Sequence, residues 1–298
     1  MKKTSRREFL QNSAAGLAGF AALSSGITGF EFPGSADTID KVKLGKTGLI
    51  VSRVALGTGS AGWKYVSNQT NLGIKKFVEL SQYAYDKGIR FFDTADMYGS
   101  HTYVREALKV IPRENVTILT KVMTYDQEGW YKTEPFQTSL DRFRKEIGTD
   151  YFDIFLLHCM TNGQWPTEYR KYLDELSKAK EKGFVKTVGI SCHNIEAMIE
   201  AANNPWVDVL FARINSRGAK MDGTPEQIMK VLETARLNGK GVIGMKVFGM
   251  GDLIKDTERE ESLNYVIRSG NVHCMTLGLE SKEEVDDAVS RVMRIAKA

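Results

Sequence analysis

One alternation of two patterns fills most of this chain: a short apolar run rich in β-branched residues, a loop, and an amphipathic stretch with helical spacing. The apolar runs number eight, at residues 53–59, 90–95, 116–122, 153–159, 185–191, 208–215, 241–249 and 272–279. Apolar strands that alternate with helices favour a parallel sheet covered on both faces. Eight strand–helix pairs predict a closed α/β barrel of the (β/α)8 TIM type. An open doubly wound sheet is the alternative.

The segment before the first of these runs has the character of a hairpin. Residues 39–52 contain turn glycines at Gly45 and Gly48 and predict a β-hairpin, which we expect to cap the floor of the barrel. No break in composition after residue 37 marks a second domain. We therefore expect a single barrel domain over residues 37–298.

The composition narrows the class of function. A chain of 298 residues with 42% apolar and 26% charged residues is typical of an ordinary globular protein. A net charge of +4 without a basic stripe argues against a nucleic-acid partner. Three cysteines cannot form a disulfide framework, and there is no CxxC pattern. Four histidines without a His-x-His pattern argue against a metal-dependent hydrolase, and we expect no metal.

The first 36 residues differ from the rest of the chain. Arg6 and Arg7, followed by Phe9 and Leu10, precede a weakly apolar run rich in Gly and Ser. This opening resembles a twin-arginine export signal, with small residues for cleavage near Ala36. The run is too weakly apolar for a stable membrane span. We therefore expect a twin-arginine signal peptide, recognised by that export machinery, and an exported protein in the periplasm; a disordered basic tail is the alternative.

Residues 57–62, GTGSAG, match the glycine spacing of a dinucleotide-binding fingerprint. In that fingerprint the glycines open a helix directly, whereas here residues 63–70 intervene before the next helical pattern. We therefore reject a Rossmann fold. The glycines are assigned to the first loop at the barrel mouth, where they would let a ligand approach the backbone closely.

Polar residues stand where three neighbouring predicted strands end, which is where such barrels carry their functional groups. These ends hold Asp93 and Tyr98, then Lys121, then His158. Asp93 can supply the counter-charge that a buried Lys121 needs. The ammonium would lower the pKa of Tyr98 and make it a usable general acid, while His158 could orient a carbonyl oxygen. Taken singly, Lys121 could snorkel from its strand and His158 could be a core histidine.

Five segments in chain order share one family pattern: LGKTGLIVSRVALGTG (44–59), FFDTADMYG (91–99), LTKV (119–122), SLDRFRKEIGTDYFDIFLLH (139–158) and VGISCHN (188–194). They resemble the aldo-keto reductase family. The resemblance implies a catalytic tetrad of Asp93, Tyr98, Lys121 and His158, with Tyr98 as general acid or base. It also implies an NAD(P)(H)-dependent oxidoreductase that interconverts a carbonyl and an alcohol.

The same resemblance implies a nicotinamide dinucleotide lying across the barrel mouth. The residues it assigns to cofactor binding are Gly57, Thr58, Ser191, Asn194, Asn215, Lys246, Gly278, Ser281 and Glu284. Glu284 stands about where relatives that prefer NADP carry an arginine, which favours NAD(H) over NADP(H). Alternatively, Glu284 and its acidic neighbours form a solvated first helical turn, where the helix dipole favours acids.

The chain departs from the family at several cofactor positions. Cys192 replaces an asparagine, Phe211 replaces a glutamine, and Ile214 replaces the aromatic that stacks on the nicotinamide. Phe248 or Trp63 could serve in place of that aromatic. These departures keep open a second hypothesis, a non-catalytic or cofactor-impaired ligand-binding barrel of the same fold.

Aromatic residues recur in the loops predicted at the barrel mouth. They are Trp63, Tyr125, Trp130, Tyr131 and Trp165. Flat aromatic faces suit a small-molecule carbonyl or alcohol that contains a ring, such as a sugar. Plain packing of the loops is the alternative.

Overall fold

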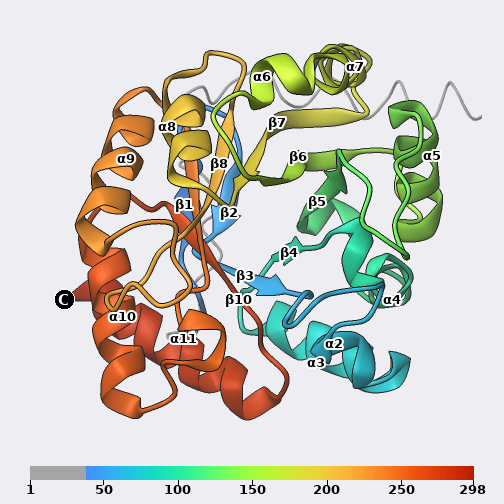
Figure 1. Cartoon of the computed structure of the whole chain (residues 1–298). Helices are drawn as coiled ribbons and strands as arrows, with labels where there is room; N and C mark the ends of the chain where they lie inside the picture. Colours follow the sequence, from blue (N-terminus) through green and yellow to red (C-terminus); the bar gives the residue numbers. More distant parts are fainter. Residues whose placement is uncertain (1–37) are drawn as a thin grey trace, which may run out of the picture. The chain divides into compact units, whose positions relative to one another are not determined.

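The computed structural model describes residues 38–298, so the predicted signal peptide at residues 1–36 lies outside the described residues. Parallel strands close into a barrel in the order β10–β3–β4–β5–β6–β7–β8–β9, with helices around it (Figure 1). The predicted (β/α)8 barrel is therefore confirmed, and the open doubly wound alternative is wrong.

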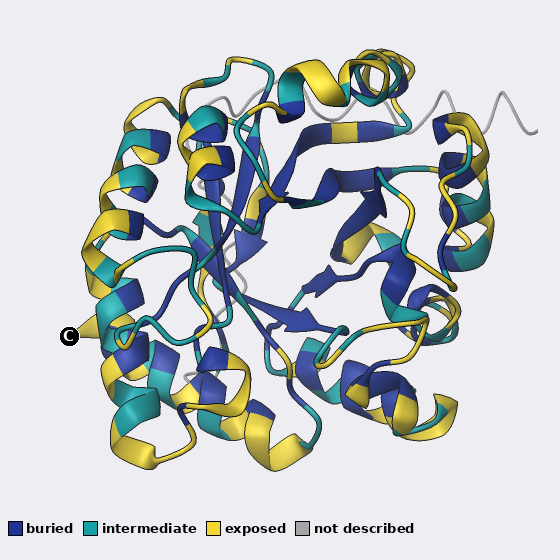
Figure 2. Ribbon diagram, viewed as in Figure 1, coloured by how far each residue is buried: buried dark blue, intermediate teal, exposed yellow. Residues whose placement is uncertain are grey.

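Each predicted strand overlaps an observed one. The barrel strands are β3 Val54–Gly57, β4 Phe91–Asp93, β5 Thr117–Met123, β6 Phe152–Met160, β7 Val185–Cys192, β8 Val209–Arg213, β9 Gly241–Met245 and β10 Cys274–Leu277. Two further strands, β1 Lys41–Lys43 and β2 Ile50–Ser52, pair antiparallel as the predicted hairpin. The barrel strands are buried almost throughout, as expected for strands covered by helices outside and by side chains inside (Figure 2).

The helices pack one apolar face on the barrel. In α3, Phe77, Leu80 and Ala84 are buried at helical spacing, and Gly88 follows the helix with a φ of 88°. The helices are α2 Asn68–Asn71, α3 Ile74–Asp86, α4 His101–Ala107, α5 Phe136–Ile147, α6 Trp165–Glu168, α7 Arg170–Glu181, α8 Ile195–Asn203, α9 Pro225–Leu237, α10 Asp256–Arg268 and α11 Lys282–Lys297, with 3-10 turns η1 Asp96–Tyr98, η2 Arg113–Asn115 and η3 Gly249–Gly251. Within residues 38–298, none of these helices combines the length and apolar character needed to cross a membrane.

The hairpin closes the N-terminal end of the barrel. Leu44, in the turn between β1 and β2, belongs to the same apolar cluster as Phe91 and Leu119 of the barrel interior. Gly45, with a φ of 53°, lies so close to the start of β9 that a Cβ would stand 2.5 Å from the backbone of Lys240. Because this floor is covered, the functional side chains must be sought at the C-terminal ends of the strands.

Asp153, near the start of β6, braces the same end of the barrel. Its carboxylate accepts hydrogen bonds from Arg113 Nη2 at 2.9 Å, the backbone N–H of Ile118 at 2.9 Å and Lys186 Nζ at 2.8 Å. Asp153 is buried, so loss of its charge would leave these donors without an adequate partner. The brace ties β5, β6 and β7 together.

Asp153→Asn should lower the free energy of unfolding by about 3 to 5 kcal/mol, because the negative charge of a buried carboxylate with charged partners is removed. Urea unfolding followed by circular dichroism measures this. Asp150→Asn is the matched control, since Asp150 is fully exposed and lies 3.8 Å from Arg144. An equal loss of stability in the two variants would contradict the assigned role of Asp153.

Candidate active site

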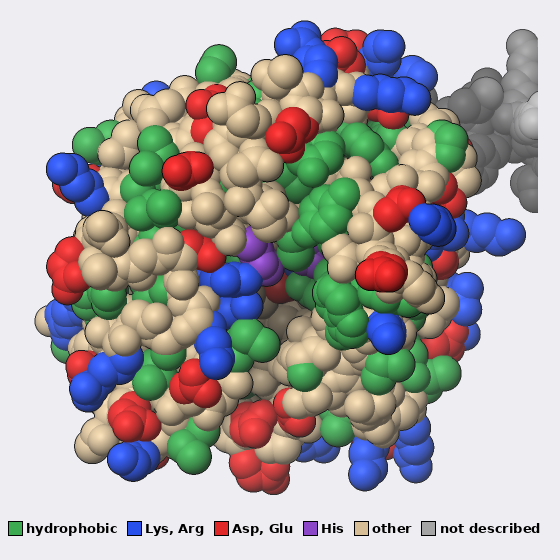
Figure 3. Space-filling view, viewed as in Figure 1, with side chains coloured by type: hydrophobic (Ala, Val, Ile, Leu, Met, Phe, Trp, Pro, Cys, Tyr) green, Lys and Arg blue, Asp and Glu red, His purple; other side chains and the backbone are tan. Residues whose placement is uncertain are grey.

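The four residues predicted at the strand ends meet on the open face of the barrel. Asp93 ends β4, Tyr98 ends η1, and Lys121 and His158 lie in β5 and β6. Lys121 Nζ donates to Asp93 Oδ1 and lies 3.4 Å from Tyr98 Oη. The rings of Tyr98 and His158 meet edge to face, with centroids 5.6 Å apart. Histidine side chains are visible in the central hollow of this face (Figure 3).

The ion pair between Asp93 and Lys121 is the buried centre of this cluster. Lys121 is 0% exposed and Asp93 is 4% exposed. Lys121 Nζ also donates to the carbonyl of Thr94 at 2.9 Å, and Thr276 on β10 donates to the second carboxylate oxygen of Asp93 at 2.9 Å. Opposite charge and further hydrogen bonds are the conditions that a buried pair requires. Sequence reasoning missed Thr276, because no motif links it to Asp93.

The expected direction of the Tyr98 pKa shift is wrong. Burial, followed by the charge of Asp93, raises the pKa of Tyr98 well above its ordinary value of 10.0. Asp93 neutralises the ammonium of Lys121 at short range, so that charge does not offset the cost of burying a phenolate. The phenol therefore stays protonated at neutral pH and is able to donate its proton.

His158 is a neutral imidazole beside this phenol. Burial, followed by the charge of Lys121, lowers the pKa of His158 well below its ordinary value of 6.5. Within the described residues, the buried Nδ1 of His158 has no hydrogen-bond partner. An uncharged ring can donate one N–H to an oxygen without bringing a second positive charge next to Lys121.

The second aspartate of residues 91–99 anchors the turn that carries Tyr98. Arg142 on α5 donates to both oxygens of Asp96, at 2.8 and 2.9 Å, and to Glu146 at 3.1 Å. Asp96, His101 and Glu146 lie close enough together to resemble a metal-ligand group. Because Arg142 already supplies a positive charge to these carboxylates, we interpret the group as an ion-pair network that positions the turn.

The glycines of residues 57–62 lie at the barrel mouth, as predicted, and two of them, Gly59 and Gly62, make room for Tyr98. A Cβ on Gly59 would stand 2.3 Å from the ring of Tyr98, and one on Gly62 would stand 2.6 Å from it. The phenol therefore packs directly against this loop. The last two glycines of the spacing that resembles a dinucleotide fingerprint are explained by the close approach of an aromatic ring, and Gly57 by the close approach of β10.

A groove of about 430 Å³ connects the cluster with the start of α11. Asp93 and Tyr98 line one end of it, and Glu280 and Asp287 line the other. The predicted cofactor residues that line it are Gly57, Lys246, Gly278 and Glu284. A groove with a reactive cluster at one end has the form of a ligand site.

Other predicted cofactor residues hold the loops of the mouth with their side chains. Thr58 is buried and donates to a backbone carbonyl of β4 at 2.8 Å. Asn194 and Ser281 cap the first turns of α8 and α11. Asn215 uses its amide oxygen and nitrogen on the backbone of its own loop and of the loop after β9. Ser191 is buried, and its hydroxyl has no hydrogen-bond partner among residues 38–298.

The residues considered for stacking on the nicotinamide ring differ in whether they line the groove. Ile214 is fully buried in the layer between the barrel and its helices. Phe211 and Phe248 line the groove. Trp63 instead packs against Trp130, with ring centroids 4.6 Å apart, and is 46% exposed. Phe248 therefore remains available as an aromatic face, whereas Trp63 is engaged with another loop.

Two of the predicted substrate aromatics are core residues. Trp165 is 0% exposed, and its indole N–H donates to the carbonyl of Ala197 at 3.3 Å. Tyr131 is 2% exposed. The expectation that Trp165 contacts substrate is therefore wrong, because the ring fills the space beside α8. Tyr125 lies at the mouth and donates from its hydroxyl to the carbonyl of Cys159 at 3.3 Å.

Sequence comparison finds relatives that are named as aldo-keto reductases. An aldo-keto reductase from Glycine max is 34% identical over 165 residues, which cover 51% of this chain and 45% of that protein. One from Mycobacterium sp. (strain MCS) is 34% identical over 119 residues, which cover 38% of each chain. The matched segments thus span less than half the length of these relatives. L-galactose dehydrogenase from Arabidopsis thaliana is 25% identical over 248 residues, which cover 79% of this chain and 75% of that protein.

Solved structures share the fold. An aldo-keto reductase from Pseudomonas aeruginosa superimposes with a TM-score of 0.72 and 22% identity, covering 87% of this chain and 97% of that chain. One from Klebsiella pneumoniae, solved in complex with NADPH, has a TM-score of 0.61 and 18% identity, covering 86% and 90%. The model of the aldo/keto reductase family matches residues 53–297. This chain belongs to the aldo-keto reductase family.

Proposed function

We propose that the protein is an NAD(P)(H)-dependent oxidoreductase that interconverts a carbonyl and an alcohol. One observation carries this proposal: the buried Asp93–Lys121 pair lies against the hydroxyl of Tyr98 at the end of a groove. Binding alone does not require an ammonium beside a tyrosine hydroxyl. Proton transfer to a carbonyl oxygen is assisted by such a pair.

The groove fits a nicotinamide dinucleotide. Gly57 and Gly278 line it with their backbone, and the space beside each is occupied by Thr276 and Ser60 respectively. Ser191, near the end of β7, does not line the groove itself, but within residues 38–298 its buried hydroxyl has no partner, and a carboxamide would satisfy it. Phe248 offers an aromatic face. When bound, the dinucleotide supplies or accepts a hydride.

Each tetrad side chain has a defined part in the proton transfer. Tyr98, which burial keeps protonated, donates its proton to the carbonyl oxygen in reduction and accepts one in oxidation. Lys121 Nζ, which lies 3.4 Å from the hydroxyl, would donate a hydrogen bond to the resulting phenolate, and Asp93 holds Lys121 in place. His158, as a neutral donor, orients the reacting oxygen.

The second hypothesis is a cofactor-impaired ligand-binding barrel. It is supported by the placement of Ile214, which is buried and cannot stack on a nicotinamide. The complete tetrad argues against it, and turnover distinguishes the two hypotheses. For the substrate, the half-exposed Trp63 beside Trp130 supports a ring compound such as a sugar.

Tyr98→Phe should reduce kcat at least about a hundredfold, because it removes the proton donor. Dinucleotide affinity, measured by fluorescence titration, should be unchanged. Tyr103→Phe is the matched control, since Tyr103 lies on α4 and packs against Phe77 away from the tetrad. A Tyr98→Phe enzyme that keeps more than about a tenth of its rate would exclude Tyr98 as the acid.

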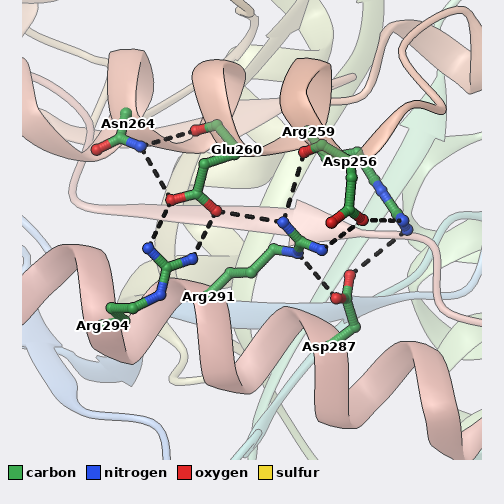
Figure 4. Close-up of polar contacts among 7 residues, drawn as sticks. All are labelled: Asp256, Arg259, Glu260, Asn264, Asp287, Arg291 and Arg294. Atoms are coloured by element: carbon green, nitrogen blue, oxygen red, sulfur yellow. Dashed lines mark hydrogen bonds and ion pairs between the residues drawn. The ribbon is translucent and has the colours of Figure 1, made fainter.

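The far end of the groove bears on the choice of dinucleotide. Glu280, Glu284 and Asp287 line it, opposed by Arg259 on α10. Arg259 lies 3.2 Å from Asp256 and 3.4 Å from Asp287 (Figure 4), so part of its charge is already neutralised. The surplus of acids supports a preference for NAD(H), since a 2′-phosphate would meet negative charge.

NADH should bind more tightly than NADPH in a fluorescence titration at constant ionic strength. Glu284→Gln should narrow this difference, because Glu284 lines the groove. Glu283→Gln is the control, since Glu283 is exposed in the same helical turn but is not part of the groove. Tenfold tighter binding of NADPH, about 1.4 kcal/mol, would overturn the preference.

We also propose that residues 1–36 direct export to the periplasm through the twin-arginine machinery. The support is the sequence around Arg6 and Arg7. Replacing both with lysine should retain the precursor in the cytoplasmic fraction, as measured by immunoblotting of cell fractions. Replacing Lys2 and Lys3 with arginine is the charge-matched control. Cytoplasmic retention of the unaltered protein would contradict the proposal.

A further inference from the structure

A second group of polar residues lies beside His158, on the ends of the next strands. We call it the cationic corner: His193 after β7, Arg213 at the end of β8, Asp222 in the following loop, and Lys246 after β9. Arg213 Nη2 donates to His193 Nδ1, and Arg213 Nη1 donates to Asp222 Oδ1 at 3.1 Å. The rings of His158 and His193 are 6.4 Å apart between centroids. The corner therefore borders the tetrad.

The contact with Arg213 fixes the tautomer of His193. Because a guanidinium is only a donor, Nδ1 of His193 must be the acceptor, and Nε2 must carry the proton. Nε2 lies 3.7 Å from the thiol of Cys159, which is a weak acceptor. Burial, followed by the charge of Arg213, lowers the pKa of His193 to about 2, so the ring stays neutral. His193 thus offers an N–H whose present partner is weak.

Lys246 adds to the corner a positive charge that no acidic side chain among residues 38–298 pairs with. It lines the groove, and within residues 38–298 its Nζ has no hydrogen bond or ion pair. The charge of Lys121 is balanced by Asp93, and that of Arg213 by Asp222. Two of the five N–H donors of Arg213 are used in the contacts described above. The corner therefore has one net positive charge, and it has N–H groups that can still donate hydrogen bonds to a ligand.

Unpaired polar atoms gather around this corner. The described residues contain eight buried side-chain polar atoms without a hydrogen-bond partner. Five of them lie at the ends of β6, β7 and β8 or in the loop after β8: His158 Nδ1, Ser191 Oγ, Arg213 Nε, Ser216 Oγ and Asp222 Oδ2. Buried polar groups without partners are uncommon in a folded protein, so their concentration points to a polar ligand.

Backbone strain is concentrated on the same face. Among residues 38–298, seven residues other than glycine have a positive φ, and all lie at or after the C-terminal ends of barrel strands. Lys246 of the corner has a φ of 55°, and Cys159, which borders the corner, has a φ of 61°. Such conformations cost free energy and persist where the surrounding structure holds them, commonly at functional sites.

We propose that the cationic corner binds a carboxylate of the substrate, next to the carbonyl on which Tyr98 and His158 act. This inference rests on the proposed oxidoreductase function. Lys246 provides the charge, and His193 and Arg213 provide N–H donors to the two carboxylate oxygens. The substrate class is therefore an oxo acid or hydroxy acid.

The pyrophosphate of the dinucleotide is the other anion that could meet Lys246. The electrostatic neighbours of Lys246 favour the carboxylate. Met245, the residue before Lys246, pairs in register with Arg213 at the end of β8, so Lys246 stands beside the other members of the corner. The opposite end, toward α11, is lined by acids such as Glu280. We therefore assign Lys246 to the substrate, in place of the cofactor role that the family resemblance implied.

The test compares oxo acids with their methyl esters. Pyruvate, levulinate and succinic semialdehyde, each against its ester, vary the distance between carboxylate and carbonyl. For at least one pair, the acid should have a KM about tenfold lower than its ester. Lys246→Met should remove that difference by raising the KM of the acid, with smaller changes in the KM of the ester and in dinucleotide affinity. Lys246→Arg should restore part of it, and Lys182→Met, an exposed charge at the end of α7, should have no effect.

The pH dependence gives a second readout. Burial, followed by the charge of Arg213, lowers the pKa of Lys246 to about 8, with Asp222 and Lys220 as its other charged neighbours and Cys159 as a thiol nearby. Since Lys246 loses its charge as the pH rises through about 8, the KM of the acid should increase there and that of the ester should not.

The outcomes separate this inference from the proposed function. A Lys246→Met enzyme that binds dinucleotide tenfold more weakly, with its acid-to-ester ratio unchanged, would assign the charge to the cofactor and overturn the inference. Equal KM values for every acid and ester in the unaltered enzyme would overturn it as well. If no carbonyl is reduced, the oxidoreductase proposal fails, and isothermal titration with the same oxo acids tests the carboxylate site by itself. Binding that is lost in Lys246→Met supports a carboxylate site at the corner. The absence of binding refutes it.

Discussion

The buried ion pair between Asp93 and Lys121 is the interaction on which the rest of the structure depends. Neither charge would be stable in the interior without the other, and both need additional hydrogen bonds. Those bonds come from Thr94 after β4 and from Thr276 on β10, so strands from both ends of the chain must be in register around the pair. Closing the barrel and assembling the reactive cluster are therefore one event.

The two ends of the barrel are built differently. At the floor, the β1–β2 hairpin and the carboxylate of Asp153 join neighbouring elements through satisfied contacts. At the open face, loops adopt strained conformations and leave polar atoms unpaired, as at Lys246 and Ser191. Arg142 limits the freedom of one such loop by holding Asp96. The stability of the floor allows the open face to be shaped by ligand chemistry.

Periodicity was sufficient to predict the barrel, because strands buried on both faces and helices buried on one leave local patterns. The tetrad was also predictable, since the ends of neighbouring strands meet. The contacts of Arg142 and of His193 with Arg213 were not, because they join segments that no local pattern relates. The prediction that Trp165 contacts the substrate was wrong, because the sequence around a loop aromatic is the same whether the ring faces the solvent or the core. The pKa shift of Tyr98 depends on a balance between burial and charge that only the folded geometry sets.

The packing of Tyr98 on Gly59 and Gly62 has a consequence for how relatives of this chain diverge. Because a Cβ at either glycine would overlap the phenol ring, the fitness of a residue at one position depends on the residues at the other two. A larger side chain in the loop becomes acceptable only after the ring has shrunk or the loop has lengthened. These three positions should therefore covary as one inherited unit, and two glycines of a pattern that resembles a nucleotide fingerprint are present because an aromatic ring packs on them.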